Sequence, residues 1–177
     1  MTEDQFWDIV GRTTRFQDNT GKQTKALENI LDALPDDEIV AFEGHYAAQM
    51  NRAYTWELWG AVYVVHGGAS DDAFEYFRNW LISRGRAVFE QVLADPDSLA
   101  DLVAPGSSGV LEYEEFAGVA RKIWKYQTGF RAGEMPSSPR MIRDDQPSGS
   151  PFEEDDAYLA NRYPKLWQRF GQTPLGG

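Results

Sequence analysis

Three acidic residues and one arginine follow a glycine pair near the middle of the chain, and their spacing lets them act together. Asp71, Glu75 and Arg78 are separated by four and three residues, which places them on one face of a helix, with Asp72 beside them. Because arginine presents a planar fork of donors, this mixed-charge face could clamp a charged group of a partner protein. The alternative is a solvated helix face with an ordinary ion pair between Glu75 and Arg78, which stabilises a helix by roughly 0.2–0.5 kcal/mol.

A histidine just before the glycine pair suggests a second kind of site, for a metal ion. His66 ends one expected helix, and Asp71, Asp72 and Glu75 open the next. An imidazole and carboxylates could together bind zinc, manganese or iron. No HExxH spacing is present, however, and the favourable interaction of negative charge with a helix N-terminus explains the two aspartates. The chain also has no cysteine, which excludes thiolate ligands. We therefore expect no metal and no other cofactor.

Acid–base catalysis has two candidate positions. Glu57 lies between Trp56 and Trp59, and burial beside tryptophans would raise the pKa of a carboxyl group, as general acids require. Glu43 and His45 are two residues apart on an expected helix and therefore point in different directions. Without a nucleophile motif such as GxSxG, the sequence favours a protein that is not an enzyme.

Phosphate binding would require a local excess of positive charge. Arg78, Arg84 and Arg86 form the one basic cluster of the central segment, and a regulatory domain for nucleic acid is the weakest of the hypotheses. The formal net charge of the chain is −11, which repels phosphate backbones. We therefore do not expect a nucleic acid as a partner.

The composition indicates one folded unit. The chain has 177 residues, of which 42% are hydrophobic and 14% aromatic, enough to form a buried core. The N-terminal residues lack the basic and apolar stretches of a signal peptide, and no segment has the apolar length that crosses a bilayer. We expect a soluble, cytoplasmic protein that does not enter a membrane.

Apolar residues recur at helical spacing in most of the chain. Stripes and start signals predict helices around residues 2–16, 27–34, 36–50, 54–65, 70–94, 98–103, 112–126 and 153–170. No segment alternates with a period of two and is also followed by a hairpin turn. The predicted fold class is all-α (mainly α): a single compact helical domain in which one long helix, about 70–94, packs against a buried Trp-rich helix.

Composition also divides the chain. Residues 131–152 are rich in Pro, Ser, Gly and charged residues, which predicts an exposed loop. We therefore expect a helical domain over residues 1–130, the loop over 131–152, and a helical segment over 153–177 that docks on the same domain.

Two blocks of sequence carry a family resemblance. They are YTWELWGA at 54–61 and GGASDDAFEYFRNWLI at 67–82, followed by Gly85-Arg86; Phe6-Trp7 and Asp95-Pro96-Asp97 agree with them. Over about residues 1–130 the chain resembles an uncharacterised, mainly bacterial family, domain of unknown function 4240 (DUF4240). The resemblance supports the domain boundary and implies no catalytic residues.

Small size, strong negative charge and the lack of a catalytic motif favour a non-catalytic protein-interaction domain, of the adaptor or immunity type, with another protein as its partner. Asp71, Asp72, Glu75 and Arg78 are its candidate surface. The rival hypothesis is a small helical enzyme, either metal-assisted or based on Glu57. A concave arrangement of Asp71, Glu75 and Arg78 would mark them as a site.

Overall fold

The computed structural model describes residues 1–103, 109–136 and 145–175 and shows a helical chain. The α-helices are α1 (Glu3–Thr13), α2 (Thr20–Leu31), α3 (Asp36–Arg52), α4 (Trp56–His66), α5 (Asp71–Ser83), α6 (Arg86–Ala94), α7 (Leu99–Leu102), α8 (Val119–Thr128), α9 (Asp156–Arg162) and α10 (Pro164–Phe170). Short 3-10 helices are η1 (Thr14–Phe16), η2 (Pro96–Ser98), η3 (Glu114–Gly118) and η4 (Ala132–Glu134). The described ranges contain no β-strand, only one isolated bridge between Thr55 and Ser148. The all-α prediction is confirmed.

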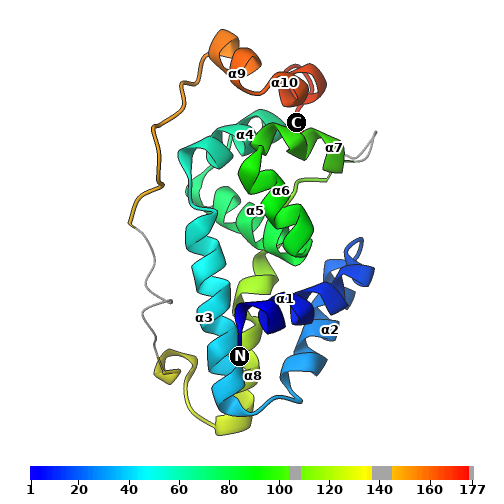
Figure 1. Ribbon diagram of the computed structural model, residues 1–177, viewed down its shortest axis with the longest axis vertical. Coiled ribbons are helices and arrows are strands. Elements are labelled where there is room, and N and C mark those ends of the chain that lie inside the picture. The colour runs from blue at the N-terminus through cyan, green and yellow to red at the C-terminus, as the bar shows by residue number, and fades with distance from the viewer. Residues whose placement is uncertain (104–108, 137–144, 176–177) are drawn as a thin grey trace.

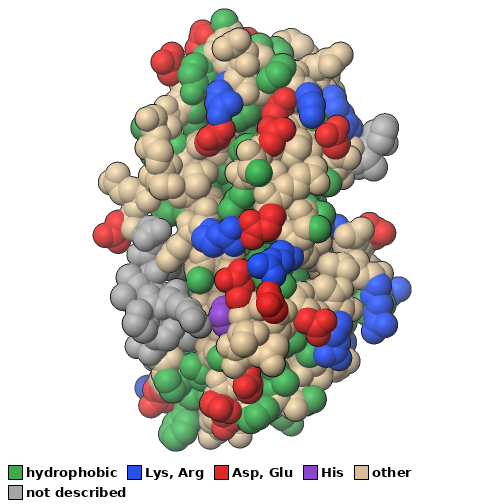
Figure 2. All heavy atoms as spheres, in the orientation of Figure 1, with side chains coloured by type: hydrophobic (Ala, Val, Ile, Leu, Met, Phe, Trp, Pro, Cys, Tyr) green, Lys and Arg blue, Asp and Glu red, His purple; other side chains and the backbone are tan. Residues whose placement is uncertain are grey.

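Helix α3 organises the packing. It follows the long axis of the molecule, with α1, α2 and α8 beside its first half and α4 to α7 beyond them (Figure 1). α3 and α2 both pack against α8, α1 packs against α2, α3 and α5, and α4 packs against α10. Lys, Arg, Asp and Glu side chains mix over the middle of the face in Figure 2. Ion pairs also connect elements, since Arg52 pairs with Glu90 at 2.8 Å and Arg86 with Asp4 at 2.6 Å.

Local signals set where the helices begin. Thr2 and Gln5 form a capping box at the start of α1. Thr55 and Ser70 cap α4 and α5, because their side-chain oxygens accept hydrogen bonds from backbone N–H groups of the first turn. These caps fix the start of the Trp-rich helix and of the helix that follows it.

The Trp-rich helix α4 is buried, as predicted. Leu58, Trp59, Val62 and Val65 are all at most 9% exposed and belong to the aromatic core. No helix in the described ranges is long and apolar enough to cross a membrane.

The single long helix predicted over 70–94 is wrong, because the chain breaks at Gly85 into α5 and α6. Gly85 has φ 89° and ψ 167°, a conformation that residues with a Cβ rarely adopt. The apolar stripe keeps its helical phase across the break, since Phe77 and Leu81 of α5 and Phe89 and Val92 of α6 are all buried. The stripe therefore did not reveal the break.

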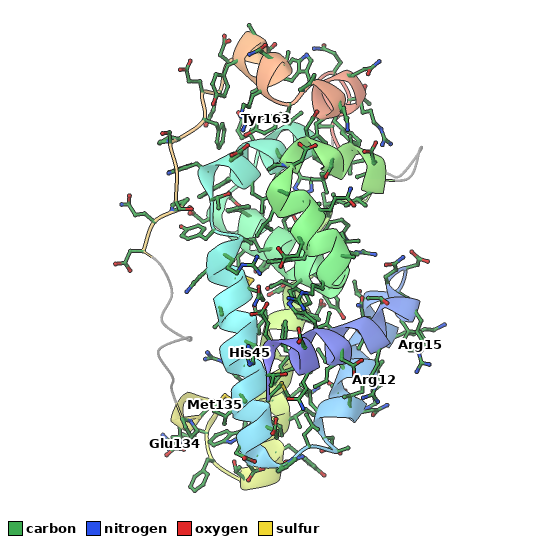
Figure 3. The ribbon with its side chains drawn as sticks, in the orientation of Figure 1. Arg12, Arg15, His45, Glu134, Met135 and Tyr163 are labelled. Carbon is green, nitrogen blue, oxygen red and sulfur yellow. The ribbon has the colours of Figure 1, made fainter. Side chains whose placement is uncertain are left out.

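The C-terminal segment packs on α4 and on the turn before α7. Tyr163 donates its hydroxyl hydrogen to the Glu57 carbonyl and fills the space beside Gly60, where an added Cβ would lie 2.5 Å from the hydroxyl oxygen (Figure 3). The Asp97 carboxylate accepts from the backbone N–H groups of Lys165 and Leu166 and so caps α10. The division into residues 1–130, 131–152 and 153–177 stays a prediction, and the middle of the expected loop, 137–144, lies outside the described residues.

Replacing Gly85 by alanine should destabilise the protein, because the added Cβ disfavours the positive φ on which the break between α5 and α6 depends. We expect G85A to lower the free energy of unfolding by about 1–3 kcal/mol, measured by chemical denaturation. Gly11, inside α1 with no atom near its missing Cβ, is the matched control, and G11A should be neutral or stabilising by up to about 1 kcal/mol. Equal stability of the two variants would contradict a glycine-dependent break.

Candidate functional site

A pocket lies between the end of α3 and the start of α5. Its volume is about 140 Å³, and its walls are formed by Met50, Asn51, Tyr54, Asp71, Asp72, Glu75 and Arg78. Three carboxylates and one guanidinium therefore meet in one concavity, which we call the carboxylate pocket. The candidate residues predicted to share a helix face do lie together, and the face they share forms a wall of the pocket.

The first turns of α5 supply the carboxylates. The Ser70 hydroxyl accepts from the Ala73 N–H at 3.2 Å and fixes the start of the helix. Asp71 and Asp72 occupy the first turn, where the positive end of the helix dipole favours ionised carboxylates, and both are exposed. Glu75, one turn later, is half-buried. The pocket thus has two exposed carboxylates and one more sheltered carboxylate.

Arg78 is part of the buried wall rather than of a solvated face. Arg78 is 9% exposed, so the alternative of a solvated helix face does not hold for this residue. Nη1 donates to the Met50 carbonyl at 3.0 Å, and Nε donates to the Phe74 carbonyl at 3.4 Å. The guanidinium therefore links α3 to α5.

The hydrogen bond from Arg78 also completes the end of α3. Met50 is within four residues of the C-terminus of that helix at Arg52, where backbone carbonyls lack partners within the helix. A cation at this position is favoured because the C-terminus is the negative end of the helix dipole. Arg78 belongs to α5 but acts as a cap for α3.

Two neighbouring aromatic rings lie against the Arg78 guanidinium. Its Cζ lies 4.5 Å from the ring centroid of Tyr54 and 5.0 Å from that of Phe74. Phe74 in turn stacks on Trp59 with the ring centroids 4.7 Å apart, and the Trp59 indole N–H donates to the Ala69 carbonyl at 3.0 Å. A desolvated cation on aromatic faces is stabilised by roughly 2 kcal/mol. The pocket wall is therefore built from the core and has little freedom to move.

The part of the chain that builds the pocket also has recognisable relatives. Residues 1–126 match the family model described as Protein of unknown function (DUF4240). The chain belongs to the DUF4240 family. Every pocket residue lies inside the matched range, whereas α9 and α10 lie beyond it. The chain matches none of the curated proteins and none of the solved structures with which it was compared.

In this DUF4240 domain, His66 serves a structural contact. Its Nε2 accepts a hydrogen bond from the Leu111 backbone N–H at 3.1 Å, so that nitrogen is unprotonated. Burial lowers the pKa of His66, which favours the neutral ring. Among the described residues, no group of three or more His, Asp or Glu side chains could hold a metal ion. His66 and the carboxylates of α5 are therefore not brought together as a ligand set.

The other acid–base candidates are also engaged inside the DUF4240 domain. Glu57 is about half exposed and pairs with Arg162, so it does not lie in a buried pocket of the kind expected for a general acid. Glu43 is buried and pairs with Arg121 at 2.6 Å. His45, labelled in Figure 3, places Nε2 3.1 Å from the Met1 carbonyl, to which it donates. Glu43 and His45 thus have different partners, and enzyme activity stays an untested hypothesis.

The three arginines of the predicted basic cluster make contacts with different partners. Arg84 stacks on Trp80 at 4.5 Å and donates to the Gln17 carbonyl, and its burial lowers its pKa. Arg86 pairs with Asp4, and Arg78 lies in the carboxylate pocket. Each arginine therefore has its own contacts within the domain.

Sequence reasoning missed the side of the pocket that α3 contributes. Met50, Asn51 and Tyr54 stand at the end of α3 and in the turn after it, and no spacing in the sequence relates them to Asp71 or Arg78. The one signal was Tyr54, which opens one of the two blocks that carry the family resemblance. Its role as a ring against a buried cation depends on tertiary packing.

Arg78→Lys should destabilise the fold although it keeps the charge. A lysine ammonium lacks the planar fork that donates to both the Met50 and Phe74 carbonyls, and it cannot lie flat against an aromatic ring. We expect a loss of about 1–3 kcal/mol in the free energy of unfolding by urea, the cost of a buried polar group left without its partner.

The control for that measurement is Arg86→Lys, at an arginine that is about half exposed and paired with Asp4. It should change the free energy of unfolding by less than about 0.5 kcal/mol. If R78K were as stable as R86K, the Arg78 guanidinium would not be the link between α3 and α5.

Proposed function

We propose that this DUF4240 domain is a non-catalytic, cytoplasmic protein-interaction domain of the adaptor or immunity type, and that its carboxylate pocket receives a cationic side chain of a partner protein. The observation behind the proposal is the pocket itself, in which Asp71, Asp72 and Glu75 surround a concavity with one fixed arginine in its wall.

The size of the pocket favours a side chain over a free metabolite. Sites for small molecules usually enclose about 300–1,000 Å³. The carboxylate pocket, at about 140 Å³, is smaller than that range and matches a single anchoring side chain. Pockets that hold one side chain at the centre of an interface supply much of the binding energy between proteins.

The charge of the pocket favours a cationic side chain. Three carboxylates face one guanidinium, and the Arg78 guanidinium already donates to the Met50 and Phe74 carbonyls. Lysine or arginine of a partner could pair with Asp71 and Asp72 at the exposed edge and place its stem against Tyr54. The net charge of −11 would also steer a basic partner toward the domain.

The pocket can be tested with minimal ligands and nuclear magnetic resonance. Acetyl-arginine methylamide and acetyl-lysine methylamide should shift the backbone amide signals of residues 70–76 and 51–54, because the cation enters the pocket between these segments. Acetyl-citrulline methylamide has the shape of the arginine compound without its charge and should leave these signals in place. High salt should weaken the shifts, since the two edge carboxylates are exposed.

A matched pair of variants completes the test. Asp71→Asn with Asp72→Asn should weaken binding of the arginine compound at least tenfold, because it removes the edge carboxylates. Asp36→Asn with Asp37→Asn makes the same charge change at two exposed aspartates in the first turn of α3 and should leave binding unchanged. Equal shifts with citrulline, or equal loss in both variants, would overturn the proposed pocket chemistry.

A further inference from the structure

A second concavity, with the opposite charge, runs between α1 and η1 on one side and α2 on the other. Its volume is about 960 Å³, and its cationic lining residues are Arg12, Arg15, Lys22 and Lys25. We call it the basic groove. It shares no lining residue with the carboxylate pocket.

The charge of the basic groove is contrary to that of the whole molecule. The chain has 28 Asp and Glu against 17 Lys and Arg, yet none of the lining residues is acidic. Arg12, Arg15 and Lys22 are exposed, and in the described part of the chain none of them has an ion pair; Lys25 pairs with Glu28 at 3.2 Å. Arg12 and Arg15 project outward from α1 and η1 in Figure 3, and Lys and Arg side chains gather along the same edge in Figure 2.

Apolar side chains form the floor of the basic groove. Ala26 and Ile30 are one turn apart on α2, and Leu34 continues the row beyond the end of that helix. Ile30 and Leu34 are half-buried against the core yet still line the groove. An apolar row of this spacing accepts side chains at positions i, i+3 or i+4, and i+7 of another helix.

We propose that the basic groove docks an acidic amphipathic helix of a partner protein. The apolar face of that helix would lie on Ile30 and Leu34, and its carboxylates would pair with Arg12, Arg15 and Lys22 along the edge. The apolar floor distinguishes this occupant from a nucleic acid, whose phosphates require only the cations. With the carboxylate pocket, the domain would have two separate docking surfaces of opposite charge, as an adaptor needs, although the groove does not depend on the pocket.

A peptide selection tests the groove while its partner is unidentified. A display library of random 16-residue peptides is selected on the full chain, and the peptides that lose binding to the Arg12→Glu, Lys22→Glu double variant are sequenced. We expect acidic peptides with apolar residues at i, i+3 or i+4, and i+7. The best of them should gain helix on binding and should bind the double variant at least tenfold more weakly in fluorescence anisotropy.

Three further variants distinguish binding in the basic groove from a general effect of charge and from binding in the carboxylate pocket. Lys125→Glu with Arg131→Glu makes the same charge change at exposed residues outside the groove and should leave peptide binding unchanged. Ala33→Glu places a carboxylate at an exposed lining position and should abolish binding. Asp71→Asn with Asp72→Asn should have no effect, so that failure of the pocket and failure of the groove give different results.

The proposal is overturned if no peptides are enriched, if the enriched peptides are not acidic and amphipathic, or if the control pair weakens binding as much as the groove pair. It is also overturned if duplex DNA or a phosphatidylserine vesicle binds the wild type and binds the Arg12→Glu, Lys22→Glu variant more weakly, while peptide binding is the same in both proteins. All the substituted residues are exposed, so the substitutions leave the core intact.

Discussion

The burial of the Arg78 guanidinium is the interaction on which the carboxylate pocket depends. Removing a cation from water costs several kcal/mol unless the protein replaces its hydration. Here two backbone carbonyls and two aromatic rings replace it, and they come from α3, from the turn after α3, and from α5. Because these groups must converge on one side chain, the relative position of the two helices is set, and with it the shape of the pocket.

The same constraint links the pocket to the segment around Ser148, which lies after the DUF4240 match. Tyr54 stacks its ring on Arg78, while its backbone carbonyl accepts from the Ser148 N–H at 2.9 Å. Ser148 also accepts from the Trp56 N–H, so the segment is fixed on both sides of Thr55. The residues after 126 lie outside the DUF4240 match, yet they hold the backbone next to the pocket. A partner at the pocket would therefore contact a surface that is braced by the core and by this segment.

Much of the fold could be predicted from the sequence because its signals are local. The capping residues Thr2 and Ser70 accept hydrogen bonds from backbone N–H groups that are only three residues away in the sequence. The break at Gly85 could not be read from the apolar stripe, since α5 and α6 bury residues that keep one helical phase. A helical phase that stays the same along the sequence indicates which residues face the core. It does not indicate that the helix between them is continuous.

The candidate site shows the same division. The shared face of Asp71, Glu75 and Arg78 follows from helical geometry, and the structure places all three on one pocket. The burial of Arg78 did not follow, because its partner Met50 is distant in sequence and its ring neighbour Tyr54 belongs to another element. Likewise, no local pattern in the sequence shows that His66 has a different partner from the carboxylates of α5. That partner is the Leu111 backbone N–H, which comes from a later segment and donates to the His66 Nε2.

The most direct measurement is the nuclear magnetic resonance signal of the Arg78 side chain in the free protein. If the guanidinium is fixed by the Met50 and Phe74 carbonyls, its Nε–H should exchange slowly with water, and its Nη–H protons should give separate signals because rotation is hindered. An exposed arginine such as Arg12 should give fast exchange and averaged signals in the same spectrum. If Arg78 behaved like Arg12, it would be a solvated surface residue, and the pocket described above would not be a fixed site.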